Sequence, residues 1–195
     1  MKKILAMMLV VMMVAVMFVA CTEKPANNGG ENGGDAKGEV FDVGEFTVSV
    51  PSGWKAYSVD DIFASVEGTK YTDKVQITNS SADTMNPFVD SYLQIDYYGA
   101  DTTMMKPDST WYDEPEEIAP IQLDNYTWSG FKAKSAGTAV MVFWAEDGDD
   151  QFQVMVWPET GKKISETDAG FLAILGSIAP KTAEATAEAT AEAAA

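Results

Sequence analysis

The chain has 195 residues and a lopsided charge, with 30 Asp and Glu against 13 Lys and Arg, which gives a formal net charge of −17. Every basic residue is Lys and there is no His, so imidazole-based catalytic relays and imidazole metal sites are excluded. The acidic balance also argues against a nucleic-acid partner, because such proteins need a basic surface that usually contains Arg.

The first residues have the features of a secretory signal. Lys2 and Lys3 precede an uncharged run over 4–20 that is rich in Met, Val and Leu. A positive start, an apolar stretch and a small residue before the cut are typical of a signal peptide. The run is slightly shorter than the roughly 20 residues that a membrane-spanning helix needs. We therefore predict that residues 1–20 are a signal peptide.

The only cysteine of the chain, Cys21, directly follows Phe18, Val19 and Ala20. These four residues resemble the lipobox of bacterial lipoproteins, with Phe18 where that family usually has Leu or another aliphatic residue. The resemblance implies cleavage between Ala20 and Cys21 and attachment of a lipid to Cys21. It further implies a protein held at the extracytoplasmic face of the cell membrane, because two or more acyl chains anchor a protein firmly.

Three composition shifts divide the rest of the chain. Residues 21–38 are rich in Gly and Asn and nearly free of apolar side chains, so we expect a flexible linker after the lipidated cysteine. Residues 39–180 have the aromatic and aliphatic density of a core and the length of one common domain. Residues 181–195 contain three copies of Thr-Ala-Glu-Ala and predict a low-complexity tail.

The domain opens with a clear strand signal. Apolar and polar residues alternate over 46–50, and Pro51-Ser52-Gly53 then predicts a turn after which Trp54 packs back onto the core. A short helix is expected over 58–66, because Ser58 and Asp61 are spaced like a capping box. Three apolar residues would form its buried face: Ile62, Phe63 and Val66.

Strand patterns continue toward the C-terminal end. We expect strands over 75–78, 91–98 and 126–131, and a central strand over 139–145, which is apolar at every position. The Asp-Gly pair within 146–150 predicts a hairpin turn. The returning strand over 151–157 would place three apolar residues on one face: Phe152, Val154 and Val156.

A closing helix is expected after Ser165 and Asp168, which are again spaced like a capping box. An apolar stripe runs from Phe171 to Ile178, and Pro180 would end the helix. Consecutive strands with helices near both ends predict the α+β class, a single domain with an antiparallel β-sheet flanked by helices.

The segment from Phe46 to Trp54 resembles the opening of PsbP/Mog1-like domains, in which a first strand runs into a Pro-x-Gly-Trp turn. The closing helix over 171–178 is similar to the helix that ends such domains. The resemblance implies an antiparallel sheet with helices packed against its faces and an accessory or binding role without catalysis. The alternative is that a Pro-Gly turn before Trp arises in many β proteins.

Carboxylates are the reactive groups that the chain has in quantity. The acidic clusters at 113–117 and 146–150 could bind Ca²⁺ weakly, because this ion prefers oxygen ligands from flexible loops. Neither cluster has the spacing of a known calcium loop, and the alternatives are a solvated surface and a hairpin turn. We therefore predict no metal site and no cofactor.

Trp111 and Tyr112 stand beside acidic residues and Pro in a predicted loop, which makes them candidate ligand contacts. Exposed aromatic rings stack on sugars or anchor protein partners, whereas the alternative for this pair is ordinary packing.

These features together predict a lipid-anchored, extracytoplasmic accessory module that binds an unidentified protein partner and is not an enzyme. One alternative is a carbohydrate- or cell-wall-binding module, which the aromatic content favours. Another is a carboxylate-based hydrolase, because a glycosidase needs only two carboxylates. The acidic field favours cationic partners or serves solubility.

Overall fold

The computed structural model describes residues 38–80, 86, 89–158 and 163–181. The predicted signal peptide, the Ala20–Cys21 cleavage and lipidation site, nearly all of the linker and nearly all of the C-terminal tail lie outside these residues. Those predictions are therefore not addressed by the described structure.

The described residues form two antiparallel sheets. A small sheet has the strand order β1-β2-β10, and a large sheet has the order β3-β4-β5-β9-β8-β7-β6. The small sheet consists of β1 (Glu39–Asp42), β2 (Phe46–Val50) and β10 (Ala179–Pro180). The large sheet consists of β3 (Lys55–Asp60), β4 (Lys70–Thr78), β5 (Tyr92–Tyr98), β6 (Asp113–Gln122), β7 (Thr127–Ser135), β8 (Thr138–Asp147) and β9 (Asp150–Trp157).

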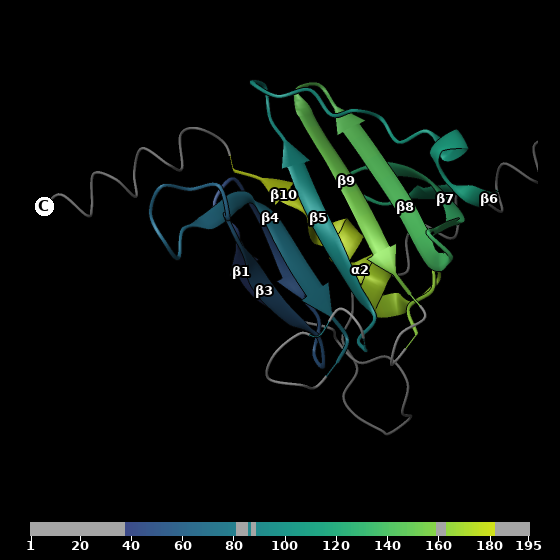
Figure 1. Cartoon of the computed structure of the whole chain (residues 1–195), viewed down its shortest axis with the longest axis horizontal. Helices are drawn as coiled ribbons and strands as arrows, with labels where there is room; N and C mark the ends of the chain where they lie inside the picture. Colours follow the sequence, from purple (N-terminus) through teal and green to yellow (C-terminus); the bar gives the residue numbers. More distant parts are fainter. Residues whose placement is uncertain (1–37, 81–85, 87–88, 159–162, 182–195) are drawn as a thin grey trace, which may run out of the picture. The chain divides into compact units, whose positions relative to one another are not determined.

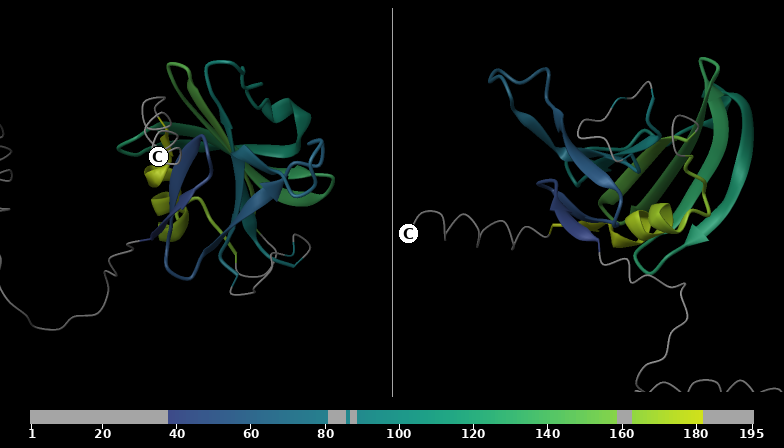
Figure 2. Two further views of the ribbon diagram at one scale, coloured as in Figure 1. Left: turned by 90° about the vertical axis from the view of Figure 1, so that its left-hand side faces the viewer. Right: turned by 90° about the horizontal axis from the view of Figure 1, so that it is seen from below.

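The two faces of the large sheet have different neighbours. Helix α2 (Ala169–Ser177) and the small sheet lie on one face, and the short 3₁₀ helix η1 (Ser109–Trp111) lies on the opposite side (Figures 1 and 2). The main core fills the space between the large sheet and the α2 layer, with side chains such as Phe46, Val154 and Phe171 fully buried. We call the face turned away from α2 the outer face.

The predicted hairpin over 139–157 is confirmed. Strand β8 lies inside the sheet, and two consecutive residues of this strand, Val142 and Phe143, are buried on opposite faces of the sheet. Asp147 pairs with Asp150 across the turn, where Gly148 has a φ of 61° that suits glycine. The turn at 51–53 is also confirmed: Trp54 donates its backbone N–H to the Pro51 carbonyl (3.0 Å) and packs against the core.

The predicted helix over 58–66 is wrong. Residues up to Asp60 belong to β3, and residues 61–68 form the connection to β4. Asp61 does not close a capping box with Ser58; instead its side chain accepts a hydrogen bond from the Phe63 backbone N–H at 2.9 Å. Because Ser58 is paired with Val75, the backbone continues as a strand where the helix was expected to begin.

The α+β fold class is therefore also wrong. The described structure is mostly antiparallel β-sheet, and α2 is the one α-helix in the described residues. It packs on one face of the large sheet, and the three-residue 3₁₀ helix η1 is too short to cover the other, so the sheet is not flanked by α-helices on both faces (Figure 2). The amphipathic pattern at 58–66 matched a helix in spacing, but its apolar side chains have no layer to pack against.

The closing helix is confirmed, with a different cap from the one expected. Asp168 itself is the N-cap, and its carboxylate accepts hydrogen bonds from the backbone N–H groups of Gly170 (2.8 Å) and Phe171 (3.1 Å). Ser165 instead shares a hydrogen bond with Thr167 (3.2 Å between the hydroxyl oxygens). Pro180 lies beyond the helix in β10, opposite Phe46.

The acidic segment at 113–117 belongs to β6, an edge strand that sequence reasoning did not predict. Pro115 and Pro120 lie in β6, within two stretches where its register with β7 shifts. Proline lacks a backbone N–H, so it is tolerated at a sheet edge or bulge but not in a central strand. The prolines and acids also protect this edge from pairing with another chain.

Candidate functional site

A groove of about 570 Å³ lies on the outer face of the large sheet, over β7 and β8. Trp144 of β8 and Ser129 of β7 are register partners and line its floor. Phe131 continues the floor, with its ring centroid 6.1 Å from that of Trp144. We call this hollow the outer groove.

Two walls enclose the outer groove. One wall is the start of η1, which contributes its N-cap Asp108 and its first residue Ser109. The other wall is β6, where Glu117 is the register partner of Phe131. The groove thus combines an aromatic floor with polar side chains from η1, β6 and β7.

Several polar groups of the outer groove have no hydrogen-bond partner among the described residues. The indole N–H of Trp144, the hydroxyls of Ser129 and Ser109 and the carboxylate of Glu117 make no hydrogen bond or ion pair with residues that the structure describes. They are therefore available to a ligand as both donors and acceptors.

The charged groups beside these side chains are already engaged. Asp108 accepts a hydrogen bond from the Thr110 backbone N–H (2.8 Å), which holds the pKa of Asp108 below its ordinary value. Lys106 forms an ion pair with Glu146 at 3.1 Å, so its positive charge is largely balanced.

The structure separates the two candidate contact residues. Trp111 ends η1 and is 59% exposed, whereas Tyr112 is half-buried with its ring centroid 5.2 Å from that of Phe131. Tyr112 therefore supports the floor of the outer groove from the side.

Sequence reasoning missed Trp144, which the continuous apolar run assigned to the core. The signal that could have found it is the small residue Ser129 on the neighbouring strand, which leaves space beside the large ring of its register partner. Using that signal requires the register between β7 and β8, which local patterns do not contain.

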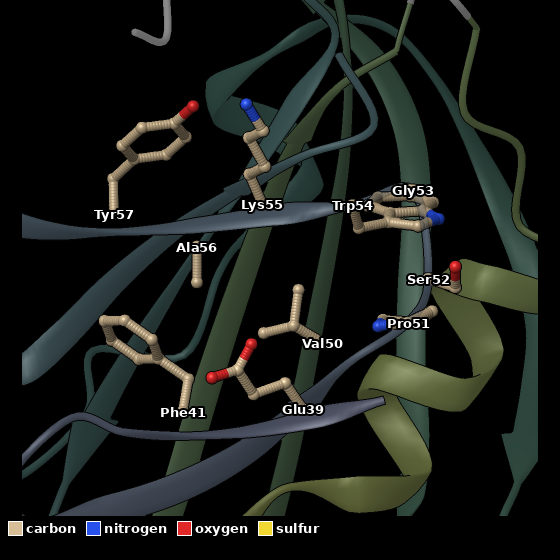
Figure 3. Close-up of a pocket in the computed structure, with 10 residues that line it drawn as sticks. All are labelled: Glu39, Phe41, Val50, Pro51, Ser52, Gly53, Trp54, Lys55, Ala56 and Tyr57. Atoms are coloured by element: carbon tan, nitrogen blue, oxygen red, sulfur yellow. The ribbon is translucent and has the colours of Figure 1, made fainter. Parts of the chain in front are cut away.

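A second hollow of about 580 Å³ lies between β1 and β3 (Figure 3). Phe41 of β1 and Ala56 of β3 face this space from opposite sides, and Val50 and the carboxylate of Glu39 lie beside them (Figure 3). Both strands are sheet edges in the described structure, since β1 pairs with β2 and β3 pairs with β4. We call this hollow the edge cleft.

The connection between β3 and β4 exposes three apolar side chains. Ile62 is 80% exposed, Phe63 85% and Val66 68%. The backbone beneath them is held in place, because Asp61 donates its N–H to the Thr69 carbonyl (2.9 Å) and the Thr69 hydroxyl donates to the Val66 carbonyl (2.8 Å). We call residues 61–68 the apolar loop.

The acidic clusters do not form a compact ligand set. Residues 113–117 lie along the edge strand β6, and residues 146–150 span the β8–β9 turn. Within the described ranges, no group of three or more Asp, Glu, His or Cys side chains converges as a metal site. None of the helices in these ranges is long and apolar enough to span a membrane.

Comparisons with known proteins give a limited picture. No protein-family model matches the chain, and no curated protein matches it. Similar solved structures include a crystal structure from Bacteroides thetaiotaomicron VPI-5482, with 12% identity, a TM-score of 0.43 and 76% of this chain covered. This chain spans 50% of the length of that protein.

Another similar structure is the solution structure of cyanobacterial PsbP from Synechocystis sp. PCC 6803. It has 11% identity and a TM-score of 0.38, and the match covers 78% of this chain and 98% of that one. A PsbP-like protein is thus among the structural neighbours, at low identity.

Proposed function

We propose that this chain is a lipid-anchored, extracytoplasmic accessory protein that binds a protein partner and performs no catalysis itself. The observation that carries the proposal is the apolar loop, which exposes Ile62, Phe63 and Val66 together. Contiguous exposed apolar side chains are costly in water and usually mark an interaction site. Aromatic residues such as Phe63 are also typical anchors of protein interfaces.

The edge cleft also supports a protein partner, because it adjoins the apolar loop. Strand β3 forms one wall of the cleft and leads directly into the apolar loop. A partner segment that contacts the loop could extend along β3 and cover Phe41, Val50 and Ala56. Edge strands accept such segments through main-chain hydrogen bonds.

The charges around the loop indicate the chemistry of the partner. Asp61 and Glu67 belong to the apolar loop, and the whole chain has a net charge of −17. The partner surface should therefore combine an apolar pocket with a basic rim. Association should slow as salt is added, because salt screens the electrostatic steering.

Photo-crosslinking tests the partner directly. A photoreactive residue at position 63 of the membrane-anchored protein, in the cells that produce it, should give a discrete cross-linked product. The same residue at position 136, in the exposed β7–β8 turn, serves as the control. Replacing Ile62 and Val66 with Ser should remove the product. Equal cross-linking from positions 63 and 136 would contradict the proposal.

The anchoring part of the proposal depends on the lipobox resemblance at Phe18–Cys21. Its test is a Cys21→Ala variant with a second cleavage site that preserves signal removal. We expect the cleaved variant to leave the membrane fraction while the parent protein stays in it. If the cleaved variant still fractionates entirely with membranes, the anchoring proposal fails.

A further inference from the structure

We propose that the outer groove binds an uncharged pyranose ring of a glycan. This site lies over β7 and β8 and shares no residue with the apolar loop, so it would give the protein a second ligand beside its protein partner. The proposal rests on the aromatic floor of the groove, on its polar groups without hydrogen-bond partners and on its negative charge.

The aromatic floor matches the apolar face of a sugar ring. One face of a pyranose carries axial C–H groups, which pack against flat aromatic side chains. Trp144 is half-buried and lines the open groove, whereas Phe131 is only 2% exposed and packs beside it as support. Indole also carries a polar N–H at its edge, which lets one residue contact both the ring face and a hydroxyl.

The polar groups match the hydroxyls of a sugar. A hydroxyl both donates and accepts, and it is best bound by a mixture of donors and acceptors. The indole N–H of Trp144 is a donor, the Glu117 carboxylate is an acceptor, and the Ser129 and Ser109 hydroxyls can do both. None of the four groups has a partner among the residues that the structure describes.

The charges of the groove select an uncharged sugar. Asp108 and Glu117 both line the groove, and their carboxylates would repel a uronic acid or a phosphorylated sugar. Lys106, the cation that lines the groove, is paired with Glu146. An anionic ligand would thus meet like charge without a free counter-charge.

The dimensions also suit such a ligand. A volume of about 570 Å³ falls within the range of small-molecule sites. The groove is open to solvent, so neighbouring sugar units could continue out of it along the sheet. A single unit of a chain could therefore bind without cleavage of the chain.

The test uses the purified protein and a panel of neutral gluco-, galacto-, manno- and N-acetylglucosamine oligosaccharides, with uronic-acid oligosaccharides beside them. Tryptophan fluorescence and calorimetry report binding. We expect at least one neutral oligosaccharide to bind and the uronic-acid series not to bind. No response from any neutral member at millimolar concentration, or equal binding of the uronic-acid series, would overturn the proposal.

Variants locate the site. Trp144→Phe keeps an aromatic ring but removes the indole N–H, and Ser129→Ala removes a hydroxyl. Each should weaken binding by about fivefold, as expected for the loss of one hydrogen bond. Trp157→Phe is the matched control, because Trp157 stacks on Tyr92 (4.5 Å between ring centroids) outside the groove. An equal loss in Trp157→Phe and Trp144→Phe would overturn the assignment.

Discussion

The phenol of Tyr97 donates a hydrogen bond of 2.6 Å to the carboxylate of Asp150, which joins the neighbouring strands β5 and β9. The Tyr97 ring also packs on Phe152, with 4.8 Å between the ring centroids. Burial raises the pKa of Tyr97 well above its ordinary value, and the hydrogen bond to Asp150 adds to the effect. Burial likewise raises the pKa of Tyr126 to about 12, and the negative charge of Asp150 adds to this effect.

These shifts predict a loss of stability at high pH. The folded state keeps both phenols protonated after the unfolded state has begun to lose its protons near the ordinary tyrosine pKa of 10.0. The stabilising contribution is therefore complete below this pH and is lost as the pH rises through about 12. Urea unfolding at a series of pH values should show a free energy of unfolding that declines above pH 10.

Tyr97→Phe is the control for the alkaline decline. It removes the hydrogen bond to Asp150 and should lower stability by about 1–2 kcal/mol at neutral pH, since bonds to charged groups contribute more than neutral ones. Its decline above pH 10 should also be shallower, because one of the two shifted phenols is gone. A parent protein with equal stability on both sides of this range would contradict the pKa argument.

Two glycines of α2 should respond to alanine with opposite signs. A Cβ at Gly170 would lie 2.5 Å from Nε1 of Trp54, so the half-buried indole must move. A Cβ at Gly176 would meet only Cδ1 of Leu123, at an ordinary 3.7 Å. Gly170→Ala should destabilise by about 1–3 kcal/mol through overpacking. Gly176→Ala should stabilise by about 0.5–1 kcal/mol, because alanine is the better helix former.

Thermal unfolding of the two alanine variants measures this difference, with the parent protein as the reference. Both substitutions add one methyl group to the same helix, so each controls for the general effect of the other. Two shifts of the same sign would mean that the contact between Gly170 and Trp54 does not constrain the position of α2.

The Asp168 cap predicts a measurable loss of helix stability. Its carboxylate satisfies two N–H groups at the start of α2, those of Gly170 and Phe171. Asp168→Ala leaves both without this acceptor and should cost about 1 kcal/mol. Asp168→Asn keeps an acceptor oxygen and should cost much less. Urea unfolding of both variants separates the cap from the charge, and equal losses would point to the charge alone.

Local patterns in the sequence predicted the parts of the fold whose chemistry is local. The alternation in β2 and β9, the Asp147-Gly148 turn and the apolar stripe of α2 are all visible without knowing any partner. Strand β6 was missed because an edge strand with two prolines carries no alternation of apolar residues. Its position becomes apparent only from its pairing with β7.

The outer groove was missed for a related reason. Trp144 and Ser129 face each other because β7 and β8 pair in one register, and a shift by one residue would turn Trp144 to the other face. A continuous apolar run such as 139–145 gives no indication of which face is covered. The candidate pair Trp111 and Tyr112 was chosen from composition, and the structure places the two rings in different surroundings.

The apolar loop gives the sharpest contrast between the sequence-based expectation and the structure. As the buried face of a helix, Ile62, Phe63 and Val66 would each contribute to stability, and replacing them would cost several kcal/mol. In the structure they are largely exposed, so the triple replacement by Ser should change the free energy of unfolding by no more than about 0.5 kcal/mol per site. Phe171→Ala, at a fully buried position, is the control and should cost about 3–5 kcal/mol. A triple variant as unstable as Phe171→Ala would show that the loop packs against another part of the protein, and the proposed partner surface would then be unavailable.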